Sequence, residues 1–218
     1  PAAQDSSGGE AVDAPREVLL NRQVVEVGAD GKARRYRRVV QRVLSEAGVR
    51  QLDRRSFRAY PGYEDLRVLH VRVLHTDGTI EEGQTGRGSR LTIDLPPLEI
   101  GDVVDMEWRR DDLKTSIFGN YFGLDAAFAP EPQLATREAD ITVLESPELK
   151  LYYHLTGNDL ANASVDTVES TLEDGTLMRR WSISDLTPRR SEALEPPAIE
   201  RTPRVQASTY ADWETFGQ

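Results

Sequence analysis

Three Asp-Gly pairs, each between two runs of strand-forming residues, constrain the fold of this chain more than any other feature. Asp-Gly is favoured in tight β-hairpins, because a type I′ turn needs positive φ at both of its central residues. Each pair therefore predicts a hairpin that joins two antiparallel strands. The pairs are Asp30-Gly31, Asp77-Gly78 and Asp174-Gly175.

Apolar and polar residues alternate in several of the runs beside these turns. The clearest run places Val104, Met106 and Trp108 on one face of a strand, and Asp105 and Glu107 on the other. Such a strand buries one face and exposes the other to water. Many short strands of this kind, with turn signals between them and no βαβ rhythm, predict an all-β antiparallel sandwich or barrel.

Composition divides the chain into three expected segments. Residues 1–15 are rich in Ala, Gly, Ser, Asp and Pro, so we expect a disordered leader. Residues 16–187 carry the strand patterns and form the expected β-domain. Residues 188–218 contain the Pro196-Pro197 pair, and we expect an extended linker followed by the start of a short C-terminal helix. Because the chain begins at Pro1 without a signal peptide, we also expect it to be a processed part of a longer protein.

The overall charge and the absence of cysteine exclude several functions. The 218-residue chain has a formal net charge of −10, which argues against a nucleic-acid-binding protein. Since there is no cysteine, a disulfide scaffold, a thiolate nucleophile and a zinc–thiolate site are excluded. No apolar run reaches the roughly 20 residues that a membrane-spanning helix needs.

No group of residues has the pattern of a complete catalytic, cofactor-binding or metal site. His70 and His75 are five residues apart, so on one strand they would point to opposite faces, and His154 is distant in sequence. Asp111-Asp112 follows a strand pattern without calcium-loop spacing, which favours a solvated face and a loop. We therefore predict no catalytic, cofactor or metal residue in this chain.

Aromatic residues near two loops are the candidate partner contacts. Two glycines bracket an aromatic pair in the segment 119–123, which predicts either a loop that packs on a partner or a strand at a sheet bend. Three further aromatics follow Thr209, a candidate helix cap, at three-residue spacing and need a surface to dock on. The predicted contact residues are Tyr121, Phe122, Tyr210, Trp213 and Phe216.

Two other clusters each leave two interpretations open. Arginines surround Tyr36 in the run 34–38; they indicate either an anion-binding edge or, as the net charge favours, a charged strand that discourages edge pairing. Tyr152, Tyr153 and Trp181 could line a sugar-binding groove, although aromatic residues at strand period are more often core, as we expect for Trp108.

Several segments together resemble a known family: the N-terminal domain of unknown function that precedes a transglutaminase-like domain in exported bacterial proteins. The resemblance runs from about residue 18 to the end and thins between residues 137 and 203. The chain departs from the family pattern in the short, Gly-rich stretch 81–90. The segments that carry the resemblance are 24–44, 44–49, 60–66, 68–79, 98–104 and 211–213.

This resemblance implies an immunoglobulin-like β-sandwich in the periplasm or outside the cell, followed by a papain-type domain with a Cys-His-Asp triad. That triad cannot lie in a chain without cysteine, so no catalytic residue is carried over. We expect a non-catalytic accessory domain whose partner is the downstream domain, and in addition an envelope protein or a glycan. The alternatives are a stand-alone carbohydrate- or ligand-binding sandwich and, less favoured, a hydrolase that uses scattered carboxylates.

Overall fold

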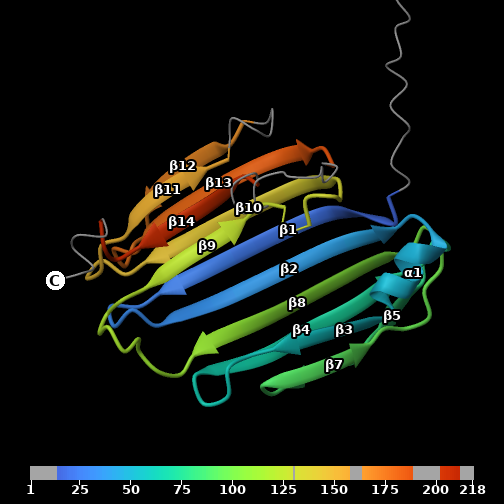
Figure 1. Cartoon of the computed structure of the whole chain (residues 1–218), viewed down its shortest axis with the longest axis horizontal. Helices are drawn as coiled ribbons and strands as arrows, with labels where there is room; N and C mark the ends of the chain where they lie inside the picture. The colour runs from blue at the N-terminus through green and yellow to red at the C-terminus, as the bar shows by residue number, and fades with distance from the viewer. Residues whose placement is uncertain (1–13, 130, 158–163, 189–201, 212–218) are drawn as a thin grey trace, which may run out of the picture.

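One large sheet of nine strands forms the body of the protein. The computed structural model describes residues 14–129, 131–157, 164–188 and 202–211. The strand order is β12-β13-β10-β1-β2-β8-β4-β5, with β6 also paired to β4 (Figure 1). Every described pair in this sheet is antiparallel except β1 with β10. The strands are β1 (Arg16–Val27), β2 (Ala33–Val43), β4 (Glu64–Leu74), β5 (Ile80–Glu82), β6 (Gly86–Arg87), β8 (Val103–Asp112), β10 (Thr136–Glu145), β12 (Asp166–Thr171) and β13 (Leu177–Leu186).

Two small sheets cover opposite ends of the large sheet (Figure 1). At one end lie β9 (Gly123–Ala127), β14 (Arg204–Ser208) and β11 (Tyr152–Thr156), with β14 in the middle. At the other end lie β3 (Arg54–Arg58), β7 (Arg90–Asp94) and the helix α1 (Glu46–Leu52). The predicted all-β antiparallel sandwich is confirmed. The immunoglobulin-like arrangement is not confirmed by this strand order.

The core consists of two main apolar clusters under the two small sheets. The first joins Ile141 and Trp181 of the large sheet to Phe122 and Val205. The second joins Leu66, Val71, Val104 and Met106 to Leu52, Phe57 and Ile93. Both lie on one face of the large sheet, because β2 contributes Ala33 to the first and Val43 to the second, an even number of positions apart. We call this the inner face, and the opposite one the outer face.

The outer face of the large sheet is built of paired charges. On β8, Asp105 accepts hydrogen bonds of 2.9 and 2.8 Å from Arg38 of β2, and its carboxylate lies 3.1 Å from the Nε2 of His70. Arg22 of β1 pairs with Asp140 of β10 at 2.9 Å. The strand alternation therefore places a polar, ion-paired layer opposite the core.

All three Asp-Gly hairpins are present, but the predicted turn type is wrong. Gly31, Gly78 and Gly175 have positive φ, whereas Asp185 is the one non-glycine residue with positive φ in the described part of the chain. In the first hairpin the amide of Gly31 donates to the carbonyl of Gly28, and the Asp30 carboxylate accepts from the amide of Lys32 at 3.0 Å. Such a three-residue loop needs left-handed backbone at the glycine alone.

Two further elements correct the sequence analysis. The only predicted helix was C-terminal, yet α1 forms after Ser45, whose Oγ accepts from the amide of Gly48. The expected linker contains β14, so the β-domain extends beyond residue 187 to Ser208. The leader up to residue 13 and the rest of the predicted C-terminal helix, residues 212–218, lie outside the described residues. No helix in the described part is long and apolar enough to cross a membrane.

Candidate interaction site

A hollow of about 500 Å³ lies at the end of the large sheet where β8 ends. Tyr60 and Tyr63, from the turn before β4, line it together with Ile117 and Tyr121 from the segment between β8 and β9. We call this the aromatic hollow. Arg35 and Asp112 also line it and supply a charged pair.

The rim of the aromatic hollow exposes large apolar side chains. The exposed fraction is 89% for Ile117, 75% for Tyr60 and 57% for Tyr63. Lys114 lies over the ring of Tyr63 with its Nζ 4.7 Å from the ring centroid. Single exposed apolar residues are ordinary on a protein surface, but several at one hollow indicate an interaction site.

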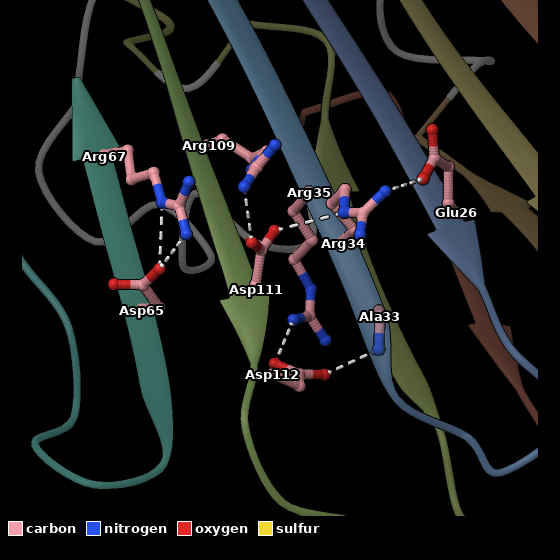
Figure 2. Close-up of polar contacts among 9 residues, drawn as sticks. All are labelled: Glu26, Ala33, Arg34, Arg35, Asp65, Arg67, Arg109, Asp111 and Asp112. Atoms are coloured by element: carbon pink, nitrogen blue, oxygen red, sulfur yellow. Dashed lines mark hydrogen bonds and ion pairs between the residues drawn. The ribbon is translucent and has the colours of Figure 1, made fainter. Parts of the chain in front are cut away.

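Asp112 fixes the end of β8 beside this hollow (Figure 2). Its carboxylate accepts from the backbone amide of Ala33 at 2.9 Å and from Arg35 at 2.5 Å. The guanidinium carbon of Arg35 lies 5.8 Å from the centroid of the Phe122 ring. The loop expected at Asp111-Asp112 is wrong, because both residues belong to β8 and Asp112 connects the end of this strand to β2 and to the aromatic segment.

Asp111 points to the outer face and is part of a second group of charges (Figure 2). It lies 2.8 Å from Arg109 and 3.4 Å from Arg34, and Arg34 also reaches Glu26 at 3.2 Å. On β4, Arg67 pairs with Asp65 at 2.9 Å. These opposite charges neutralise one another, and Asp111 is ion-paired to two arginines.

The two predicted contact residues of the 119–123 segment have different roles. Phe122 is 2% exposed and belongs to the first apolar cluster, so it anchors the segment and is closed to a partner. Tyr121 is only partly buried, and its ring stacks on that of Tyr210 at a centroid distance of 5.7 Å. The structure thus brings together Tyr121 and Tyr210, which are far apart in sequence. Trp213 and Phe216 lie outside the described residues.

Thr209 holds the aromatic segment against the end of β14. Its Oγ1 accepts from the amide of Phe122 at 3.2 Å, and its own amide donates to the carbonyl of Phe122 at 3.2 Å. The hydroxyl expected to cap a helix is therefore engaged across the small sheet. The aromatic hollow consequently lies directly beside the point where the chain continues past Ala211.

The sequence analysis did not identify Tyr60, Tyr63 and Ile117 as contact residues. One signal was present for Ile117, because Ile117-Phe118 is an apolar pair in a loop between Ser116 and Gly119. Tyr60 and Tyr63 approach this loop only through the pairing of β4 with β8, in which Glu64 lies opposite Asp112. Sequence spacing alone does not reveal that contact.

The proposed sugar-binding aromatics do not form an exposed platform. Trp181 is 6% exposed and packs on Tyr153, with 5.2 Å between the ring centroids. The Tyr153 hydroxyl donates to the carboxylate of Glu145 at 2.8 Å. Burial, and then this hydrogen bond, raise the pKa of Tyr153. Tyr152 alone of the three is exposed.

Two of the three histidines, His70 and His75, lie beside carboxylates. The Nδ1 of His75 lies 3.0 Å from the buried carboxylate of Asp102, and His70 lies between Asp105 and Glu107. Within residues 14–211, as far as they are described, no three His, Cys, Asp or Glu side chains are grouped closely enough to hold a metal ion.

The structure is a β-domain of two small sheets on one large sheet, with an aromatic hollow where β8 ends. The chain belongs to the family DUF3857, "Domain of Unknown Function with solved-structure structure", whose model matches residues 29–86 and 87–190.

The fold is similar to that of a longer protein. The crystal structure described as "a putative protease from Parabacteroides distasonis" matches with a TM-score of 0.76 and 16% sequence identity. The match covers 90% of this chain but 40% of that one, so this chain spans less than half the length of the similar structure. No curated protein matches the sequence.

Proposed function

We propose that this chain is a non-catalytic accessory domain of a longer, exported bacterial protein, and that it docks a neighbouring transglutaminase-like domain at the aromatic hollow. The observation that carries the proposal is the position of the hollow beside Tyr210, where the chain leaves the β-domain. The similarity in fold to a chain more than twice as long supports it. The proposed location is the periplasm or the cell exterior.

The chemistry of the hollow defines what docks there. Ile117, Tyr60 and Tyr63 provide an apolar rim, and the Arg35–Asp112 pair is already neutral. Burial of a partner's apolar side chain within this rim stabilises the docked state by about 25 cal/mol for each Å² of apolar surface removed from water. The docked surface is therefore apolar at its centre, with polar groups at its margin.

A stand-alone carbohydrate-binding module is the alternative function. Its expected platform of Trp181 and Tyr153 lies in the core, so a glycan would have to stack on Tyr152 or on the Tyr60–Tyr63 pair. The latter pair lines the aromatic hollow, and for this reason the same variants test both functions.

The test uses the natural protein that extends past Gln218 and compares Ile117→Asp with Ile80→Asp. Ile80 is a matched control, because it is 60% exposed and pairs with Leu74 at the far end of β4 from Tyr63. We expect Ile117→Asp to speed protease cleavage between the two domains and to lower kcat/KM of the downstream domain about tenfold, the loss of one interface anchor.

Ile80→Asp should leave both measurements unchanged. Equal cleavage rates and equal kcat/KM in the two variants and the parent would overturn the docking proposal. Glycan binding that Ile117→Asp or Tyr63→Ala abolishes, with no effect on the domain contact, would favour the carbohydrate-binding alternative.

A further inference from the structure

Three arginines on the inner face lie between the two apolar clusters. Arg37 of β2 and Arg110 of β8 are diagonal neighbours, since Arg37 lies opposite Trp108 and Arg110 lies opposite Arg35. Arg55 of β3 points toward them, because it shares a strand face with Phe57, whose ring meets that of Trp108 edge-on at 5.2 Å. We call Arg37, Arg55 and Arg110 the inner arginines.

The inner arginines have no acidic partner among the described residues. Their two neighbours are neutralised: Arg35 pairs with Asp112, and Arg16 pairs with Glu131. Arg37 donates from Nε to the amide oxygen of Asn21 at 3.2 Å and lies over the Trp108 ring at 5.6 Å, and neither contact removes its charge. The Nε of Arg110 is buried without a hydrogen-bond partner.

Arginines on the outer face of the large sheet differ from the inner arginines in their ion pairing. There, the arginines of the large sheet are ion-paired. On the inner face, where an unpaired charge is costly, three are not. The paired outer arginines are Arg22, Arg34, Arg38, Arg42, Arg67, Arg72, Arg109 and Arg180.

The electrostatics agree with this geometry. Burial, followed by the positive charges of Arg110 and Arg55, lowers the pKa of Arg37 to about 10. Burial and the charge of Arg16 also lower the pKa of Arg55. Arg37 therefore stays charged at neutral pH, and the negative charge of Glu131 offsets only part of this destabilisation.

We propose that the inner arginines form a binding site for an oxyanion, a carboxylate or a phosphate group, that completes the space between the two small sheets. Planar guanidinium groups on three different strands can each present two N–H donors to such a group, which suits bidentate recognition. Arg37 and Arg110 are half-buried, so each side chain keeps some exposure to solvent. This inference does not rest on the proposed docking function.

The test titrates the full chain with glutarate and, separately, with inorganic phosphate, at an ionic strength held constant with sodium chloride. Isothermal titration calorimetry gives Kd, and thermal unfolding gives Tm. We expect saturable binding of one of the two anions, with Tm rising as its concentration passes Kd. A response to glutarate alone identifies a carboxylate ligand, and a response to phosphate alone identifies a phosphoryl ligand.

Variants of the inner arginines separate a binding site from a structural cluster. Arg37→Gln and Arg110→Gln should each weaken binding about tenfold or more, since each removes a charge-assisted hydrogen bond. Without ligand the same variants should have an unchanged or higher Tm, because they relieve repulsion. Arg55→Gln provides a third variant from another strand if either of these fails to fold.

Arg58→Gln is the matched control, because Arg58 lies on β3 beside Arg55 but on its exposed face. It should bind the anion as the parent does. Failure of both anions to bind the parent chain, or unchanged affinity in the inner-arginine variants, would overturn the proposal. So would a rise in Tm that sodium chloride alone reproduces.

Discussion

Tyr153 is a single residue whose ionisation should control the stability of the protein at alkaline pH. Its folded pKa is raised above the usual value near 10 by burial and by the hydrogen bond to Glu145. The stabilisation is therefore complete below pH 10 and is lost as the pH rises toward the folded pKa, because only the unfolded chain releases the proton readily. We expect the free energy of unfolding, measured in urea, to fall between pH 10 and 12.

The variant Tyr153→Phe tests this residue directly. It leaves one oxygen of the buried Glu145 carboxylate without its donor, so the free energy of unfolding at pH 7 should fall by about 1–3 kcal/mol. Its decline above pH 10 should be shallower than that of the parent. Tyr152→Phe, at the exposed neighbouring position, should change neither quantity, and a decline as steep in Tyr153→Phe as in the parent would refute the assignment.

From residue types alone, the backbone conformation of a segment is easier to predict than the surroundings of its side chains. Each Asp-Gly pair identified a hairpin, because glycine at positive φ is needed whichever turn forms. The choice between two- and three-residue loops depends on where strand pairing begins, which a dipeptide does not encode. In the same way, nothing in the Tyr121-Phe122 pair shows that Phe122 enters the core while Tyr121 stacks on Tyr210.

Among the elements, β14 should be indispensable to the first apolar cluster. It is the middle strand of its small sheet and contributes Val205 and Ala207, both nearly inaccessible to solvent. A chain ending at Pro203 should lose the near-ultraviolet circular dichroism of Trp181 and Tyr153, since β9 and β11 would then have no partner between them. A chain ending at Ala211 retains all of β14 and should keep the contribution of Trp181 and Tyr153.

An unchanged spectrum and Tm in the shorter chain would show that β9 and β11 hold their positions independently of β14.

Two elements, β14 and α1, were not predicted from the sequence, and for related reasons. The run 204–208 is too short for its alternation to exceed the background of a proline-rich region, and its strand partners are distant in sequence. The helix α1 has seven residues, and its main local signal is the single cap at Ser45.

At the level of the whole molecule, the two apolar clusters should unfold together. Strand β2 contributes residues to both clusters and pairs with β1 on one side and β8 on the other. Unfolding of either cluster would therefore break backbone hydrogen bonds of β2 that hold the other cluster in place. Ile141→Ala in the first cluster and Leu66→Ala in the second should each cost about 2–5 kcal/mol. Each variant should shift one common transition in circular dichroism and in tryptophan fluorescence. Separate transitions for the two probes would show two independent folding units.

The parallel pairing of β1 with β10 has a consequence for the order of folding during synthesis. Val18 lies beside Thr136, so β1 waits for more than a hundred further residues to be synthesised before this neighbour exists. At translation rates of about 5–20 residues per second, the wait lasts on the order of ten seconds. During that interval β1 can pair only with β2, and the edge of β1 that later pairs with β10 stays open to other chains. The nascent chain should therefore depend on chaperones in this interval more than a sandwich built only from neighbouring hairpins would.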